Sequence, residues 1–289
     1  MNIKVKSLCK MIGAQDGAIY GDYIFRFRSK GYGYVYDLRT LPEDGSDFTP
    51  FAEFQLDKCD LIAPHSNSVV FGNEKFAPDD EFPLLYSNIY TNYRKEEDKR
   101  VGVTCVYRIM REGEGFTSRL VQLIEIGFTE NRELWRSEGD VEDTRPYGNF
   151  VVDCERGLFI GFVMRDASKT TRYFAFDLPK LASGTPDEKY GVNRVVLTPD
   201  DIRWQFDTPY HNFIQGAICR DGKVYSLEGF NEELVHPAIR VIDTLEKREV
   251  LHHDFTTTGQ RLEPEFIDFY NERCIYGDAY GNTYELFFS

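Results

Sequence analysis

Three stretches of the sequence repeat one short phrase, Pro64-His65-Ser66-Asn67, Pro146-Tyr147-Gly148-Asn149 and Pro209-Tyr210-His211-Asn212, and each runs directly into an apolar segment. A fourth stretch, Pro264-Glu265-Phe266-Ile267, keeps the proline and the apolar segment but has no asparagine. Because the phrase recurs at intervals of several tens of residues, we predict a chain built from structural repeats.

The segments between the phrases are short, rich in Val, Ile, Phe and Tyr, and separated by Gly, Asp and Asn, which is typical of strands joined by turns. The best helical candidate, near residues 179–182, is no longer than a turn or two. Four strands follow each full phrase, and this count is the pattern of β-propeller blades. The predicted strands are 68–71, 84–90, 103–110 and 120–128; then 150–154, 158–164, 173–177 and 194–197; then 213–219, 223–227, 239–243 and 249–255.

The two ends of the chain decide the number of blades. After Pro264 only three strands are predicted, 266–269, 273–276 and 283–288. Residues 4–12 resemble the outer strands elsewhere and are predicted to pair with this last blade, which closes the ring and removes open sheet edges. Residues 17–56 supply one more blade, with strands 18–20, 23–28, 34–38 and 51–56. The sequence therefore predicts one all-β domain, residues 1–289, folded as a five-bladed β-propeller of four-stranded blades.

Several phrases look like generic β-propeller repeats, and this resemblance covers nearly the whole chain. They are the turn Asp278-Ala279-Tyr280-Gly281-Asn282-Thr283-Tyr284 and third strands such as Tyr34-Val35-Tyr36-Asp37-Leu38 and Ile239-Arg240-Val241-Ile242-Asp243. These phrases encode hairpin geometry, since Gly and Asn accept the positive φ of tight turns, so the resemblance implies the fold and no particular activity. No repeat carries the Gly-His and Trp-Asp pairs of WD40 proteins.

The net charge of the chain limits the partners that it can bind. With 48 acidic and 34 basic residues the formal net charge is −14, which opposes binding to nucleic-acid phosphates and to anionic membranes. The first six residues are basic but lack the apolar segment of a signal peptide, and no stretch reaches membrane-spanning length. We expect a soluble, cytoplasmic protein unless an export signal has been removed, with neither nucleic acid nor membrane as its partner.

No metal or cofactor is expected. The six cysteines lie tens of residues apart, mostly within apolar strands, where reduced thiols behave as small hydrophobic side chains. Adjacent His252 and His253 fall on a predicted strand and would point to opposite faces. The sequence also contains neither a nucleophilic-serine elbow nor a phosphate-binding glycine loop.

The loops that lead into the innermost strands of a propeller meet at one mouth of the central channel. Residues far apart in the sequence would therefore converge there, supplying donors, acceptors, two imidazoles and aromatic surface, as a polyhydroxylated ligand requires. We expect a small polar ligand, with carbohydrates as the favoured class, although the repeated asparagines also have a structural interpretation as turn residues. The predicted ligand-binding residues are Gln15, His65, Asn67, Arg145, Tyr147, Asn149, His211, Asn212, Glu263 and Glu265.

Two alternatives remain open. Five-bladed propellers include glycoside hydrolase families, and glycosidic cleavage generally needs two carboxyl groups. Of the carboxylates on or beside inner strands, Asp16, Asp153, Asp268, Glu263 and Glu265, the catalytic candidates are Asp16 and Glu265. The chain lacks the Asp-Pro phrase that those families commonly show at the first inner strand. A protein-interaction scaffold, the second alternative, would use an exposed apolar patch on the rim.

Overall fold

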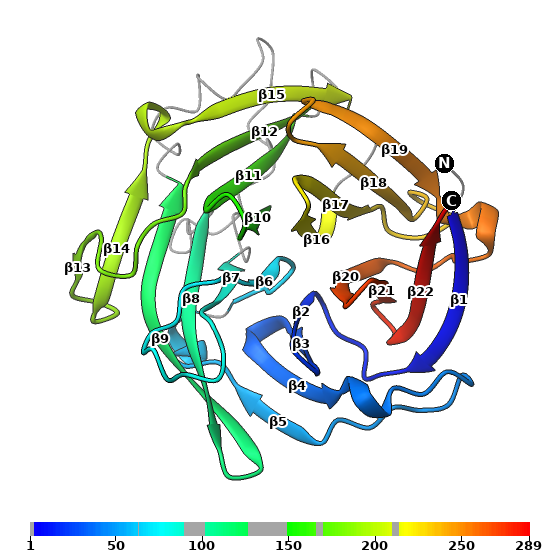
Figure 1. The fold of residues 1–289 in the computed structure, drawn as a ribbon, viewed down its shortest axis with the longest axis horizontal. Helices are drawn as coiled ribbons and strands as arrows, with labels where there is room; N and C mark the ends of the chain where they lie inside the picture. Colours follow the sequence, from blue (N-terminus) through cyan, green and yellow to red (C-terminus); the bar gives the residue numbers. More distant parts are fainter. Residues whose placement is uncertain (1–2, 63, 90–101, 127–148, 166–169, 210–213) are drawn as a thin grey trace.

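A computed structural model describes residues 3–62, 64–89, 102–126, 149–165, 170–209 and 214–289. Their strands form five sheets that stand in a ring around a common axis (Figure 1). The predicted five-bladed propeller is confirmed. In the described ranges, helical structure amounts to α1 (Cys59–Ile62) and a few short 3-10 turns.

Each blade is an antiparallel sheet whose first strand lies next to the axis, and its later strands lie successively further out. Blades one and two contain β2 (Gly17–Tyr20), β3 (Tyr23–Arg28), β4 (Tyr32–Asp37) and β5 (Ala52–Gln55), then β6 (Val69–Phe71), β7 (Leu85–Ile89), β8 (Val103–Glu112) and β9 (Gly115–Ile126). Blades three and four contain β10 (Asn149–Asp153), β11 (Leu158–Arg165), β12 (Thr170–Asp177) and β15 (Trp204–Pro209), then β16 (Ile214–Arg220), β17 (Lys223–Glu228), β18 (Ala238–Asp243) and β19 (Arg248–Asp254).

The fifth blade joins the two ends of the chain. It contains β20 (Pro264–Tyr270), β21 (Arg273–Asp278), β22 (Asn282–Phe288) and, as its outer strand, β1 (Ile3–Lys10). β1 pairs antiparallel with β22, from Ile3 opposite Phe288 to Lys10 opposite Asn282, so the two termini lie side by side (Figure 1). The predicted closure of the ring by the N-terminal strand is confirmed.

The prediction that residues 194–197 form the outer strand of the third blade is wrong. They belong to β14 (Val192–Leu197), which pairs with β13 (Thr185–Asp187) and, in parallel, with β9, so the second sheet has six strands. Arg194 fixes this arrangement through ion pairs with Glu125 of β9 at 2.6 Å and with Asp187 at 2.5 Å. The outer position of the third blade is taken by β15. Apolar alternation identifies a strand but not the sheet edge that it joins.

The hydrophobic core lies between neighbouring blades. Phe25 of the first blade has its ring centroid 5.3 Å from those of Phe71 and Phe116 of the second. Phe255, which follows β19, stacks on Tyr276 of the fifth blade at 4.7 Å. Because apolar packing holds the faces of the sheets, the two ends of the innermost strands are left to form sites at the axis.

Among the helices of the described ranges, none has the length and apolar character needed to cross a membrane.

Candidate functional site

The innermost strands β2, β6, β10, β16 and β20 define two ends of the axis. Their first residues are joined by hydrogen bonds between blades, and we call this the proximal end. Their last residues surround a shared cavity at the opposite end, which we call the distal end. The sequence-predicted ligand site belongs to the proximal end.

The repeated asparagines of the proximal end link three blades. Buried Asn67 donates from Nδ2 to Oδ1 of buried Asn149 at 3.4 Å, and it accepts a hydrogen bond from Nδ2 of Asn88. Asn149 in turn donates from Nδ2 to the carbonyl oxygen of Ile214 at 2.9 Å. Each of these contacts joins protein groups to one another, so the two asparagines stabilise the junction of blades two, three and four.

Asp16 and Glu265 lie close together in the same region and are both buried. Gln15 donates from Nε2 to Oε1 of Glu265 at 2.9 Å, while Oδ2 of Asp16 accepts from the backbone N–H of Val69 at 2.8 Å. Burial raises the pKa of both carboxyl groups well above its usual range, and their mutual repulsion and that from Glu263 raise the pKa of Glu265 further. The catalytic pair predicted from the sequence is therefore brought together as buried acids.

Arg26 of β3 is the cation of this cluster and is fully buried. Its Nη2 donates to the carbonyl oxygen of Gln15 at 2.9 Å, and its guanidinium lies 4.7 Å from the ring centroid of Phe266. Burial lowers the pKa of Arg26, whereas the nearby acids Asp16 and Glu265 raise it. Within the described ranges Asp16 Oδ1, Glu265 Oε2 and Arg26 Nη1 have no hydrogen-bond partner.

The remaining predicted ligand residues divide between the described and undescribed ranges. Half-buried Glu263 accepts from Nε2 of Gln215 at 2.6 Å, and burial raises its pKa. His65 is also partly buried, and desolvation lowers its pKa. The other four, Arg145, Tyr147, His211 and Asn212, lie outside the described residues.

The distal end holds a cavity of about 340 Å³ that all five blades line. One lining residue from each blade in turn is Tyr20, Phe71, Cys154, Arg220 and Asp268. The ring of partly exposed Tyr20 packs against that of buried Phe71 with 5.6 Å between centroids. The cavity thus combines apolar walls with a few polar groups, which is the usual composition of a small-molecule site.

Asp268 is the buried acid of this cavity, with 7% of its surface exposed. Its Oδ2 accepts from the backbone N–H of Ile19 at 2.6 Å and its Oδ1 from that of Phe269 at 2.7 Å. Burial raises the pKa of Asp268 to about 7, although these two hydrogen bonds and the charge of Arg220 lower it. A carboxyl group with this pKa changes charge near neutral pH.

Arg220 spans from the fourth to the fifth blade beside Asp268. Its guanidinium stacks over Phe269 at 4.6 Å, donates from Nη2 to Glu272 at 2.8 Å and donates from Nη1 to the carbonyl oxygen of Asn271. Its side chain is 27% exposed, so solvent screens part of its charge.

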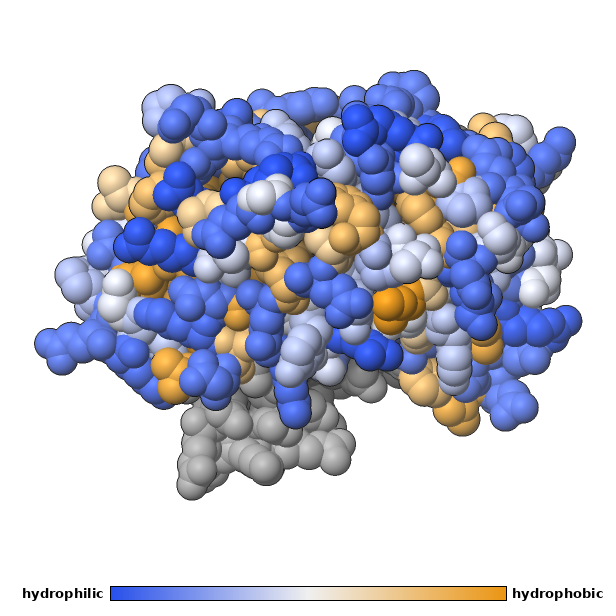
Figure 2. Space-filling model, turned by 90° about the horizontal axis from the view of Figure 1, so that it is seen from below, coloured by the Kyte–Doolittle hydropathy of each residue, from blue (hydrophilic) through white to orange (hydrophobic). Residues whose placement is uncertain are grey.

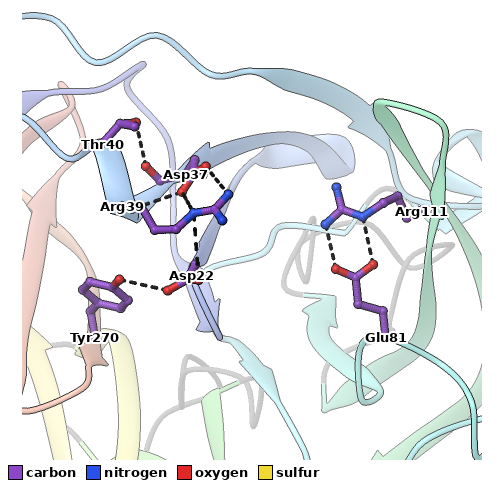
Figure 3. A network of polar contacts seen from close by, with 7 residues as sticks. All are labelled: Asp22, Asp37, Arg39, Thr40, Glu81, Arg111 and Tyr270. Atoms are coloured by element: carbon purple, nitrogen blue, oxygen red, sulfur yellow. Dashed lines mark hydrogen bonds and ion pairs between the residues drawn. The ribbon is translucent and has the colours of Figure 1, made fainter.

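A polar network borders the distal end between blades one, two and five (Figure 3). Tyr270 donates from its hydroxyl to Asp22 at 3.0 Å, and Nε of Arg39 lies 3.9 Å from the same carboxylate. Further out, Arg111 and Glu81 form a two-pronged ion pair with distances of 2.8 and 2.7 Å. These contacts fix the loops around the cavity.

Sequence reasoning placed Asp268 among the inner carboxylates but did not find the distal cavity. The missing signal is spatial, because the cavity wall joins single residues that lie tens of positions apart in the chain. Among the described residues, no group of three or more His, Cys, Asp or Glu side chains is arranged to hold a metal ion.

Comparison with known proteins gives no family. No family model matches the sequence, and no curated protein matches it. Among solved structures, the computationally designed protein Ika8 aligns over 98% of this chain and 100% of its own, with 9% identity and a TM-score of 0.35. BamB from Moraxella catarrhalis aligns over 95% of this chain and 61% of its own, with 8% identity and a TM-score of 0.34.

Proposed function

We propose that this protein binds a small polar ligand, with carbohydrates as the favoured class, in the cavity at the distal end of the propeller axis. The observation that carries the proposal is the cavity itself, which five blades line and which contains the buried carboxyl group of Asp268. Its volume of about 340 Å³ lies at the lower end of the range for small-molecule pockets and suits one or two sugar rings.

The wall chemistry supports a carbohydrate. Sugar rings present C–H groups on their faces and hydroxyl groups at their edges. Partly exposed Tyr20 offers aromatic surface to the faces. Asp268 can accept hydrogen bonds from the hydroxyl groups, because each of its oxygens has further lone pairs beyond the one used by a backbone N–H.

The surface of the ring gives less support to a protein-interaction scaffold. On the side of the molecule seen in Figure 2, apolar residues occur in small groups separated by polar ones rather than as one continuous face. A scaffold that docks a partner through its rim would present a larger contiguous apolar patch there.

Two matched carboxyl-to-amide variants test which end of the axis binds. We expect Asp268→Asn to weaken binding of a sugar found by glycan-array screening by about tenfold or more in titration calorimetry, since it removes a buried charged acceptor. Glu263→Gln at the proximal end should leave the affinity within about twofold of wild type. Thermal melting of both variants checks that each is folded.

The opposite pattern, in which Glu263→Gln weakens binding and Asp268→Asn does not, would place the site at the proximal end. Release of reducing sugar during the titration would support the glycoside hydrolase alternative.

A further inference from the structure

The hydrogen-bonding groups in the wall of the distal cavity are biased toward acceptors. Asp268 when ionised only accepts, and a carboxylate has about four lone-pair positions, of which two are used by backbone N–H groups. Arg220, which also lines the cavity, already donates to Glu272 and to the carbonyl oxygen of Asn271, and its Nε lies 3.6 Å from Asp221. A ligand group that only donates therefore fits this wall best.

The loops around the cavity add negative charge. Each of the five loops that join an innermost strand to the second strand of its blade carries a carboxylate. Together these loops, residues 21–22, 72–84, 154–157, 221–222 and 271–272, contain eight Asp or Glu residues and two Lys or Arg residues. Five of the eight acids also pair with arginines outside these loops, so eight acidic residues stand against six basic ones when those four arginines are counted; the pairs are Asp22–Arg39, Asp80–Arg108, Glu81–Arg111, Asp221–Arg220 and Glu272–Arg220.

We infer that the ligand of the distal cavity carries a positively charged amino group, as an amino sugar does. The inference rests on the proposed function, because it assigns the charge of the ligand for that same cavity. An ammonium group has three donors and no acceptor, which complements Asp268. The excess of acidic over basic residues around the cavity concentrates cations at its mouth.

The cavity defines the site, and the surrounding charges select among the ligands that fit it. Ile19, Val70 and Ile218 form apolar parts of the wall, and Asp268 itself is 7% exposed. A charge interaction with such a buried carboxylate is stronger than one with a carboxylate at the open surface. A cationic sugar should therefore gain more affinity here than its neutral counterpart.

Matched sugars test the charge directly. Titration calorimetry would compare glucosamine, galactosamine and mannosamine with glucose, galactose and mannose and with the three N-acetyl derivatives, at low and at high ionic strength. We expect at least one amino sugar to bind about tenfold or more tightly than both of its neutral counterparts, with the preference decreasing as salt screens the carboxylates.

Two exposed carboxylates provide matched variants. Glu272→Gln removes one charge from the ring around the cavity, and we expect it to lower the affinity for the amino sugar about two- to fivefold while sparing the neutral sugars. Asp200→Asn removes the same charge from an exposed position before β15, away from the innermost strands, and should leave the preference unchanged.

The outcomes separate the inference from the proposed function. Equal or tighter binding of neutral sugars would overturn the inference and leave the cavity as a sugar site. Failure of every sugar to bind would overturn both. An equal effect of Glu272→Gln and Asp200→Asn would show that net charge, and not the ring at the cavity, sets the preference, and would also overturn the inference.

Discussion

Two arginines stack on phenylalanines of the same strand, β20, and they show how the two ends of the axis differ. Arg26 lies 4.7 Å from the ring of Phe266 at the proximal end, and Arg220 lies 4.6 Å from the ring of Phe269 at the distal end. Arg26 is fully buried among acids, whereas Arg220 is partly exposed and pairs with the exposed Glu272. The same arginine–phenylalanine contact therefore occurs once in a buried environment and once in a partly exposed one.

The two ends of the axis therefore have different roles. At the proximal end the described polar side chains bond to one another and to backbone groups of neighbouring blades, which stabilises the ring. At the distal end the polar groups surround a cavity. Buried polar contacts are costly to disrupt and exposed ones are not, so stability and binding should respond to mutation at opposite ends.

The largest effect on stability is expected for Arg26→Met. Removing the cation leaves Asp16 and Glu265 buried beside one another without their counter-charge, and we expect a loss of about 3–5 kcal/mol in the free energy of unfolding. Arg220→Met makes the same change over Phe269 at the distal end and should cost less than about 1 kcal/mol. Urea denaturation measures both. Equal losses would contradict the distinction between the two ends.

The second effect concerns the pH dependence of stability at the distal end. The pKa of Asp268 rises from 3.8 to about 7 on folding, so between these values the folded protein binds more protons than the unfolded chain. The contribution of Asp268 to the free energy of unfolding therefore falls as pH rises through this window. Asp268→Asn has no such titration, and its stability relative to wild type should increase by about 2–3 kcal/mol between about pH 5 and pH 8.

Chemical denaturation of wild type and Asp268→Asn at a series of pH values tests this expectation. The buried acids of the proximal end titrate in both proteins, so the difference between the two curves isolates Asp268. A difference that stays constant from pH 5 to pH 8 would show that this carboxyl group is not desolvated.

The sequence predicted the ring well because its signals are local. Apolar alternation and turn residues identify strands such as β3 and β17, and the missing outer strand of the last blade predicts the pairing of β1 with β22. The assignment of residues 194–197 failed because the partner of β14 is chosen by distant contacts. The ion pair between Arg194 and Glu125 joins residues 69 positions apart.

The candidate site was harder to predict because the two ends of each innermost strand look alike in sequence. Asp16 and Asp268 are both acids on inner strands, yet one receives its backbone hydrogen bond from Val69 in a closed cluster and the other lines a cavity. Which acid faces a cavity depends on the packing of five blades, which no single strand encodes. The repeated asparagines were predicted as ligand residues or as structural ones, and the described contacts of Asn67 and Asn149 are structural.

The smallest expected difference in stability is between a variant of the repeated Pro-x-x-Asn phrase and a variant at the rim of the distal cavity. Asn67→Ala removes two buried hydrogen bonds, the one accepted from Nδ2 of Asn88 and the one donated to Oδ1 of Asn149, and we expect a loss of about 1–2 kcal/mol. Glu272→Gln, which changes an exposed pair with Arg220, should alter stability by less than about 0.5 kcal/mol. Thermal or urea unfolding of the two variants measures this difference. If Asn67→Ala were as stable as wild type but lost sugar binding, the asparagines would be ligand residues, and the proximal end would have to be counted as a binding surface.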